Sequence, residues 1–569
     1  MQDESGDCVA VATAEVGMIG YEMKRAIVAR LTPEMRRCLS AQTLLLSSTH
    51  THSAPGGYLT PFLFAISVKG IHRGVFDRIV NGCSQALVAA FDTRKARSVS
   101  ATTGIIRDVQ LNRSPTAYLA NPAKERDQYT SNTNEEAFTL LFGEIADQNN
   151  TNYVASFSWF GLHPTSMNFT NRLVSSDNRG YAAWKIEKSL GSAFVAAIPQ
   201  EAEGDVSPNI DGAKCPDGSP CDAATSSCKV GKCIAHGPGK NMFDSTKIIG
   251  ERMASAIMSH FKDAKRLSGS GVKSSAMFVD FSAARFDMED ANLTTCSAAF
   301  GCSFAAGTID GNPLEFGHFH QGDTDCKNKP AKIFGTFLKK PSRHLKRCHF
   351  PKPILLNTGE MERPWSWSPS VLELQLLQIG DMLIVGLPFE ITTMASRRLR
   401  RTMAEEANRL RVKFDHIVIA PLANDYADYL TTREEYAEQR YEGASTVYGP
   451  NTLSAVQLHF RLLLQNLVNG KQIPDSFGTL RRPASNIDRK YSLIPHVIYD
   501  IGHEQGKVIS DAHNEYEQGE IVSVQFYGAN PRNSQHGPLM HVEKLSLNGN
   551  SWEVFDDDSS WYTKIHWKR

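Results

Sequence analysis

Five apolar runs along the chain have the pattern of β-strands, and each ends in a polar residue that can take part in chemistry. Two of them are TLLLSSTH at residues 43–50 and YVASFSWFGLHP at residues 153–164, the second closed by a proline. In open α/β sheets, ligands bind at the carboxyl ends of the strands, so we expect the ends of these runs to meet at one site. The polar residues at or near the five ends are His50, His163, Ser207, Glu390 and Tyr429.

The pattern changes towards the C-terminus and predicts a second domain. Residues 392–411 and 452–470 read as helices, and the polar linker 471–483 follows. Beyond it, short alternating runs separated by Gly and Asn turns, such as MHVEKLSLNGNSWEVF at 540–555, predict a β-sandwich. We therefore expect an α/β domain over residues 1–475 and a β-domain over residues 485–569.

Composition and charge narrow the possible partners. Hydrophobic residues make up 41% and charged residues 21% of the 569 positions, as in an ordinary globular protein. Lys+Arg and Asp+Glu both total 61, so no basic field argues for a nucleic-acid partner. The longest apolar stretches, 58–68 and 382–389, are too short to span a membrane. The acidic start MQDESGDC lacks the apolar region of a signal peptide.

The cysteines indicate an oxidising compartment. Four of the eleven lie together in CPDGSPCDAATSSCKVGKC, at residues 215–233. Such a cluster is a zinc knot or a disulfide-stapled loop. The spacing lacks paired CxxC knuckles and favours disulfides, which form in secreted proteins. Glycosylation sequons at Asn149, Asn168 and Asn292 agree with a secretory, extracellular or cell-surface location.

The sequence THTH at residues 49–52 raises the question of a metal. A lone histidine after a strand is more often a hydrogen-bonded structural residue, and a glutamate before a helix is often only a favourable N-terminal charge. However, His50 and His52 alternate along a strand and so point to the same side. Imidazole is also a preferred zinc ligand. From these residues alone we expect an extracellular metal hydrolase.

Several longer motifs resemble the neutral ceramidase family. They occur in the family's order, and together they span nearly the whole chain: THTHSAPGGY, LNRSPTAYLANP, HPTSMNFTNRLVSSDNRGYAAW, GDVSPN, SFAAGTIDG, LPFEITTMASRRLR and YLTTREEYAEQRYEGASTVYGPNTLSA. The resemblance implies a zinc-dependent amidase that splits ceramide, met in membranes or micelles, into sphingosine and a fatty acid. It also implies a mixed-sheet catalytic domain followed by an immunoglobulin-like β-domain.

The resemblance also assigns residues to roles. It implies one zinc ion held by His50, His163, Glu390 and Tyr429. It implies that His52 hydrogen-bonds the substrate carbonyl, that Arg113 and Tyr441 hold the oxyanion, and that Ser207 is the nucleophile. A weaker match, DSSWYT, suggests a calcium site with the ligands Asp558, Ser560 and Thr563. The disulfides that it implies are Cys215–Cys228, Cys221–Cys233 and Cys296–Cys348, and Cys302 can pair with Cys326.

Both ends of the chain are expected to be incomplete. Members of the family begin with a strand ahead of the segment CVAVATAEVGMIGYEM, at residues 8–23. A sandwich domain needs about seven strands and about 100 residues, whereas about 85 residues follow the linker.

Two mechanisms and two other functions stay open. Zinc can activate a water that attacks the amide while Ser207 positions the substrate, or Ser207 can attack directly. The first is preferred, because the sequence shows no base for Ser207 other than His52, Tyr441 or the metal-bound hydroxide. The apolar segment 58–72 is either a buried helix or a lipid-facing mouth. The alternative functions are a zinc amidase for another N-acyl lipid and a non-catalytic lipid-binding surface protein.

Overall fold

A computed structural model describes most of the chain, which forms two compact units, residues 1–491 and 492–569. The described residues are 1–144, 152–191, 193–222, 225–230, 233–269, 271–282, 284–288, 291–311, 319–326, 339–470, 491–493, 504, 506–528, 540–557 and 560–562.

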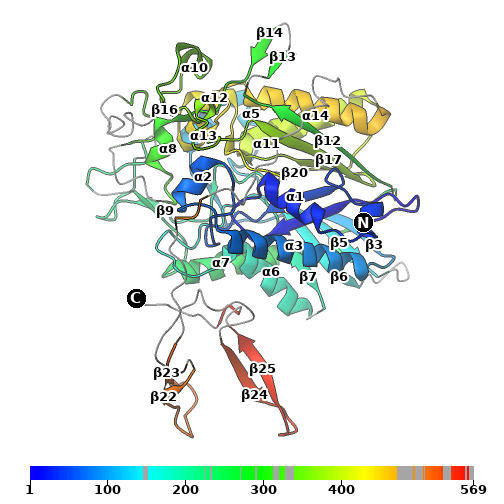
Figure 1. Ribbon diagram of the computed structural model, residues 1–569, viewed down its shortest axis with the longest axis vertical. Coiled ribbons are helices and arrows are strands. Elements are labelled where there is room, and N and C mark those ends of the chain that lie inside the picture. Colours follow the sequence, from blue (N-terminus) through cyan, green and yellow to red (C-terminus); the bar gives the residue numbers. More distant parts are fainter. Residues whose placement is uncertain are drawn as a thin grey trace. The chain divides into compact units, whose positions relative to one another are not determined.

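Two mixed β-sheets form the centre of the first unit (Figure 1). The five-stranded sheet has the order β11 (Lys265–Arg266), β3 (Ser98–Ile105), β5 (Glu136–Gly143), β6 (Tyr153–Trp159) and β7 (Val195–Ala197). The four-stranded sheet has the order β12 (Val272–Asp280), β17 (Val371–Ile379), β18 (Met382–Gly386) and β20 (His416–Ala420). Within these sheets the pairs β6–β7 and β18–β20 are parallel and the others antiparallel. The predicted mixed α/β architecture is therefore present.

The two sheets pack on each other through one apolar cluster. Phe138, Leu140 and Trp159 of the five-stranded sheet share this cluster with Ile384 and Val418 of the four-stranded sheet. All five side chains are buried. Removing this much apolar surface from water is the main force that holds the sheets together.

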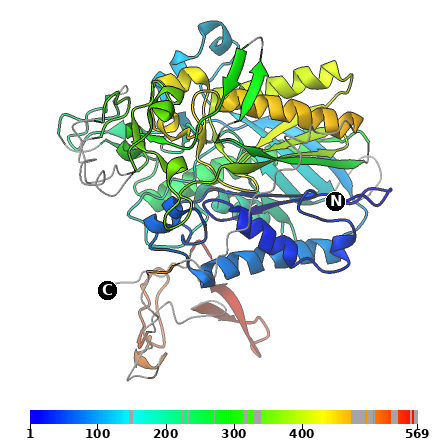
Figure 2. The ribbon, with the colours of Figure 1, turned by 45° about the horizontal axis from the view of Figure 1, so that its top comes forward.

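Helices cover the outer face of each sheet, which gives four layers (Figure 2). α11 (Thr393–Arg409) and α14 (Thr452–Asn469) pack on the four-stranded sheet. α6 (Asp177–Leu190) and α7 (Met242–Ser259) share a separate core with residues of the five-stranded sheet. Every residue of β18 is buried, because this strand is covered on both faces.

A parallel ribbon of β1 (Ala10–Ala14) and β2 (Leu44–Ser48) leads into the first predicted motif. α1 (Tyr21–Ala29) and α3 (Arg73–Asp92) pack on it. The apolar segment 58–72 contains α2 (Phe62–Ser67), where Ala65 is buried, Phe62, Leu63 and Phe64 are half-buried, and Ile66 is 43% exposed. Its ends pack into the core while α2 keeps apolar surface, so the packed element and the lipid-facing mouth both stay predictions.

Shorter elements complete the unit and carry several of the polar residues discussed below. They are η1 (Met35–Arg37), β4 (Leu111–Asn112), α4 (Pro115–Ala120), α5 (Ala123–Arg126), β8 (Val206–Ser207), β9 (Gly212–Lys214), β10 (Ile234–His236), η2 (Phe261–Asp263), β13 (Arg285–Met288), β14 (Ala291–Thr294), β15 (Phe300–Gly301), α8 (Cys302–Ala306), α10 (Arg343–Cys348), β16 (Ile354–Leu356), η3 (Thr358–Glu360), β19 (Glu390–Ile391), β21 (Tyr429–Leu430), α12 (Arg433–Ala437) and α13 (Tyr441–Ser445).

Five disulfides cross-link the first unit. Four are the pairs named from the family resemblance: Cys215–Cys228, Cys221–Cys233, Cys296–Cys348 and Cys302–Cys326. The fifth, Cys8–Cys38, was not anticipated and ties the start of the chain to the segment before β2. Among the described residues, Cys83 is the cysteine that stays outside a disulfide.

The second unit contains two antiparallel strand pairs among its described residues. They are β22 (Val508–Ser510) with β23 (Gln525–Phe526), and β24 (His541–Leu545) with β25 (Trp552–Asp557). The alternating run at 540–555 is thus a hairpin, whereas the complete sandwich and its domain limits stay predictions. Asp558 and Thr563 of the suggested calcium site lie outside the described residues. No described helix of the chain has the length and apolarity needed to cross a bilayer.

Candidate active site

Four of the predicted site residues lie where buried strands end. His50 follows β2 and His163 follows β6, while Glu390 and Tyr429 open the short strands β19 and β21. These two strands pair in parallel with Glu390 directly opposite Tyr429. All four residues are buried at 5% exposure or less. The packing of β2, β6, β18 and β20 therefore fixes the backbone positions from which these four side chains extend.

The imidazoles of His50 and His163 converge on one carboxylate oxygen. Their Nε2 atoms lie 3.2 and 3.1 Å from Oε2 of Glu390. Their Nδ1 atoms lie 2.7 Å from the carbonyls of Gly17 and Glu203, so each Nδ1 carries the hydrogen. Each ring therefore points its Nε2 at the carboxylate.

This arrangement has the character of a metal site. The Nε2 atoms of two imidazoles face one carboxylate oxygen, and a cation between them could bind all three. Ligand atoms around one tetrahedral zinc ion, with bonds of about 2.0–2.1 Å, lie roughly 3.4 Å apart, close to the separations seen. The potential ligand atoms of His50, His52 and His163 all lie within 4.8 Å of one another. The donor set fits zinc, and the histidine-rich group can bind a metal ion.

The backbone at His50 is held in a conformation that side chains seldom adopt. Its φ is +68°, in the left-handed region, which costs of the order of 1–2 kcal/mol for a residue other than glycine. Asp428, whose carbonyl accepts the Glu390 N–H at 2.8 Å, also has a positive φ of +60°. The packed surroundings compensate for this strain, and the result is that His50 and Glu390 are presented to one point.

The protonation states in the cluster suit a cation. Burial opposes ionisation of Glu390, but the imidazoles of His50 and His163 outweigh it and hold the pKa of this carboxyl well below its usual range. Burial, with a contribution from Arg113, lowers the pKa of His163 to about 4. Metal ligands must be an ionised carboxylate and imidazoles free of the extra proton, and the lowered pKa values of Glu390 and His163 both favour those states. Tyr426 fixes the other carboxylate oxygen by donating its hydroxyl to Oε1 at 2.6 Å.

His52 is the member of the cluster that faces solvent. Its Nε2 lies 3.3 Å from that of His50, and its ring packs edge-on against His50 and His163. The surrounding protein and the two neighbouring histidines lower the pKa of His52 well below 6.5, although the ring itself is exposed. A neutral, accessible imidazole beside the metal position can donate a hydrogen bond to a substrate carbonyl.

Arg113 connects the cluster to the predicted serine. It follows β4, and β4 pairs with β8, which carries Ser207. Its Nη2 donates to the hydroxyl oxygen of Tyr429 and to the Gly204 carbonyl, both at 2.9 Å. Burial raises the pKa of Tyr429, and so the hydrogen bond from Arg113 to its oxygen is the contact here that favours ionisation of the phenol. A nearby cation would add to this effect and favour the ionised phenol, which is the form in which Tyr429 can act as a ligand.

The turn that carries Ser207 is pressed against β19. The Gly204 N–H donates to the Ile391 carbonyl at 2.9 Å, and a Cβ on Gly204 would lie 2.8–3.0 Å from backbone atoms of residues 391 and 392. Only glycine fits such an approach. Asp205 accepts hydrogen bonds from the N–H and hydroxyl of Thr393, both at 2.8 Å, and so anchors the same turn to the start of α11.

Ser207 has a carboxylate partner that sequence reasoning missed. Its hydroxyl donates to Oδ1 of Asp310 at 2.5 Å, and the backbone N–H of Asn209 donates to Ser207 Oγ at 3.1 Å. The expectation that only His52, Tyr441 or a metal-bound hydroxide lies near enough to accept the serine proton is therefore wrong. Asp310 belongs to the SFAAGTIDG motif, so the motif was available as a signal but gave it no role.

Arg113 is already engaged by acidic residues. Its Nε donates to Glu442 at 2.9 Å and its Nη1 to Asp310 at 3.3 Å, so four of its five N–H groups are used in these contacts and the two above. Tyr441 begins α13, and its ring packs edge-on against that of Tyr429 with centroids 5.4 Å apart. Glu442 was also missed by sequence reasoning, although it is adjacent to the predicted Tyr441.

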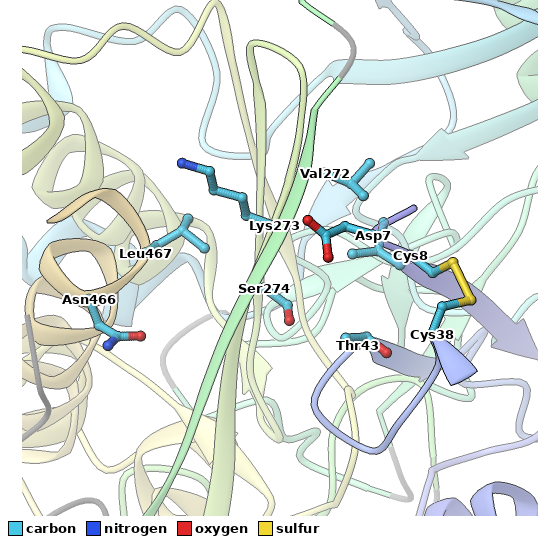
Figure 3. Close-up of a pocket in the computed structure, with 10 residues that line it drawn as sticks. Asp7, Cys8, Cys38, Thr43, Val272, Lys273, Ser274, Asn466 and Leu467 are labelled. Carbon is cyan, nitrogen blue, oxygen red and sulfur yellow. A yellow bond between two sulfur atoms is a disulfide. The ribbon is translucent and has the colours of Figure 1, made fainter. Parts of the chain in front are cut away.

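A separate pocket of about 300 Å³ contains none of the predicted site residues (Figure 3). It lies beside the Cys8–Cys38 disulfide, between the start of β12 and the end of α14. Its charged lining residues are Asp7 and Lys273, and Lys273 extends away from Asp7 in the close-up.

Comparisons with known proteins show which family the chain resembles along its whole length. The family model described as "Neutral/alkaline non-lysosomal ceramidase, N-terminal" matches residues 1–458, and the model of the family's C-terminal part matches residues 460–569. A neutral ceramidase of Drosophila melanogaster is 36% identical over 595 aligned positions, covering 100% of this chain and 83% of that protein. Neutral ceramidase B of Dictyostelium discoideum is 38% identical over 588 positions, covering 100% and 80%.

Solved structures show the same fold. One described as "Ceramidase complexed with C2" matches with a TM-score of 0.82 and 28% identity, covering 96% of this chain and 81% of that one. The crystal structure of neutral ceramidase from Pseudomonas aeruginosa matches with a TM-score of 0.79 and 27% identity, with the same coverage.

The fold and the matches define an amidohydrolase with two mixed sheets at its centre. The chain belongs to the neutral/alkaline non-lysosomal ceramidase family, whose members hydrolyse the amide bond of ceramide.

Proposed function

We propose that this chain uses one zinc ion to hydrolyse the N-acyl amide of ceramide, giving sphingosine and a free fatty acid. The observation that carries the proposal is the convergence of His50 and His163 on Oε2 of Glu390, with both Nδ1 hydrogens held by backbone carbonyls. Two imidazole nitrogens and a carboxylate oxygen that face one point form a donor set that a cation can bridge. Family membership supplies the substrate class.

The proposed roles follow from the contacts of each residue. His50, His163, Glu390 and Tyr429 would hold the ion, which when bound would polarise the amide carbonyl and activate a water. His52, exposed beside the cluster, would donate to the carbonyl oxygen as its negative charge grows. Arg113 donates hydrogen bonds both to Tyr429 and to the turn that carries Ser207, and so fixes their relative positions. Tyr441 packs against the ring of Tyr429.

A fluorescent ceramide assay of the purified chain, with and without a chelator, tests the proposal. We expect hydrolysis that the chelator abolishes and that stoichiometric zinc restores. Chelator-resistant hydrolysis would contradict the zinc dependence. Binding of ceramide without turnover, even with zinc, would favour the lipid-binding alternative. Turnover of other N-acyl lipids but not of ceramide would favour a different amidase.

We also propose that the protein resides in the secretory pathway or at the cell surface, where it meets ceramide in membranes or micelles. Five disulfides support an oxidising compartment. The side chain of Asn168, in one of the sequons, is exposed and thus accessible for glycosylation. An immunoglobulin-like C-terminal domain with a calcium site belongs to the same proposal and rests on the family resemblance.

A further inference from the structure

The hydrogen-bond capacity of the Ser207 hydroxyl is almost fully used. A serine hydroxyl has one hydrogen to donate and two lone pairs to accept with. The hydrogen goes to Asp310 Oδ1 at 2.5 Å, and one lone pair receives the backbone N–H of Asn209 at 3.1 Å. Ser207 is fully buried, so water does not replace these partners freely. One lone pair is left to face a reacting group.

Asp310 is itself held so that it stays an acceptor. The side-chain amide of Asn209 donates to the same Oδ1 at 2.8 Å. Arg113 Nη1 donates to Oδ2 at 3.3 Å, in an ion pair whose two side chains are each 2% exposed. A buried carboxylate with three donors around it is an acceptor held in a fixed position. The fixed position of the Asp310 carboxylate therefore sets the direction in which the Ser207 hydroxyl hydrogen points.

We propose that Asp310 is a positioning residue of the hydrolytic site: it binds the Ser207 hydroxyl hydrogen so that Oγ presents only a lone pair to the substrate. This proposal rests on the proposed function. It follows that Ser207 accepts a hydrogen bond from an N–H or O–H of the substrate. It does not donate to the oxyanion, which leaves that role to other groups such as His52.

Three variants separate orientation from other roles of Asp310. Asp310→Ala leaves the serine hydrogen without its partner, and we expect kcat to fall about ten- to a hundredfold. Asp310→Asn keeps an oxygen that can accept from Ser207 and Asn209, so we expect it to recover most of that loss. Ser207→Ala already removes the hydroxyl that Asp310 orients. The double variant Ser207→Ala/Asp310→Ala should therefore have a kcat less than about threefold below that of Ser207→Ala alone.

Controls keep the test interpretable if a variant is damaged. Glu373→Gln removes a comparable buried carboxylate, paired with Lys24 at 2.8 Å, and we expect its kcat to be unchanged. Zinc content and thermal melting show whether each variant is folded. Crystal structures of Asp310→Ala and Asp310→Asn, with or without activity, show whether the Ser207 hydroxyl turns away in the first and stays in the second.

The outcomes divide clearly. Recovery in Asp310→Asn with Ser207 held in place supports positioning. An Asp310→Asn variant as impaired as Ser207→Ala would overturn it and indicate proton transfer to Asp310. Full activity of Asp310→Ala would overturn it as well. Inactivity of the wild-type chain towards ceramide would instead remove the proposed function, while the crystallographic comparison would still decide the role of Asp310.

Discussion

The two halves of the candidate site are stabilised in opposite ways. Around His50, His163 and Glu390, two imidazole nitrogens converge on one carboxylate oxygen, an arrangement that suits a cation. Around Ser207 and Asp310, each donor already meets an acceptor. In the proposed function the first half is completed by a metal ion, whereas the second is preorganised by the chain itself. Removing a metal ligand and removing a hydrogen-bond partner should consequently have effects of very different size.

The largest effect is expected from the metal half. In His50→Ala and His163→Ala the ion loses one of two imidazoles, so we expect zinc content to fall far below one per chain. Activity should fall by roughly three orders of magnitude or more. Elemental analysis and the ceramide assay measure the two quantities. His349→Gln, which alters a buried histidine outside the site, is the matched control and should keep its zinc. Stoichiometric zinc in both site variants would contradict the ligand set.

Arg113→Lys tests the connection between the halves. A lysine has one point charge and cannot reach Tyr429, Asp310 and Glu442 together as the guanidinium does. We expect kcat to fall about a hundredfold while zinc remains bound, because the two strand-end histidines and Glu390 are untouched. Steady-state kinetics and metal analysis on the same preparation check this. Loss of zinc at unchanged stability would show that Arg113 serves the metal half alone.

Ser207→Ala addresses the serine half. If Ser207 positions the substrate, kcat should fall about ten- to a hundredfold, corresponding to roughly 1–3 kcal/mol. A nucleophile would cost several orders of magnitude more. Mass spectrometry of the wild-type protein quenched during turnover gives an independent test, since an acyl group on Ser207 would contradict the positioning role whatever the rate of the variant.

The smallest expected effect is on stability and comes from a buried histidine that needs no metal. His349 Nε2 donates to the Ser297 carbonyl at 2.8 Å, and burial, with a contribution from Lys352, lowers the pKa of His349 from 6.5 to about 3. Between these values the unfolded chain binds more protons than the folded one. The stabilisation is therefore complete above pH 6.5 and is lost as the pH falls towards 3.

Denaturant unfolding of the wild type and of His349→Gln between pH 7 and pH 4 measures this contribution. The free energy of unfolding of the wild type should fall more steeply with decreasing pH, by roughly 1–3 kcal/mol over the interval. Added chelator should leave that difference unchanged, in contrast to the metal half. Equal slopes for the two proteins would show that His349 does not bind an additional proton on unfolding.

The positions of the metal-half residues could be anticipated from sequence because they depend on local pattern. A buried strand such as 382–386 must end, and the polar residue after it is at the sheet's edge. That pattern brought His50, His163, Glu390 and Tyr429 forward as candidates, and the family motifs gave them the role of metal ligands. The helix predicted at 392–411 is α11, because its apolar positions recur at helical spacing.

Only the tertiary structure decided which polar atoms meet. Asp310 is 103 residues from Ser207 in the chain and lies in a turn, where no periodicity marks its direction. Arg113 reaches Glu442 across 329 residues for the same reason. A hydrogen bond needs two atoms within about 3 Å, and that precision comes from the packing of two sheets and their helices. The amino-acid pattern by itself determined the strands, the helices and the polar ends, and packing determined the partners.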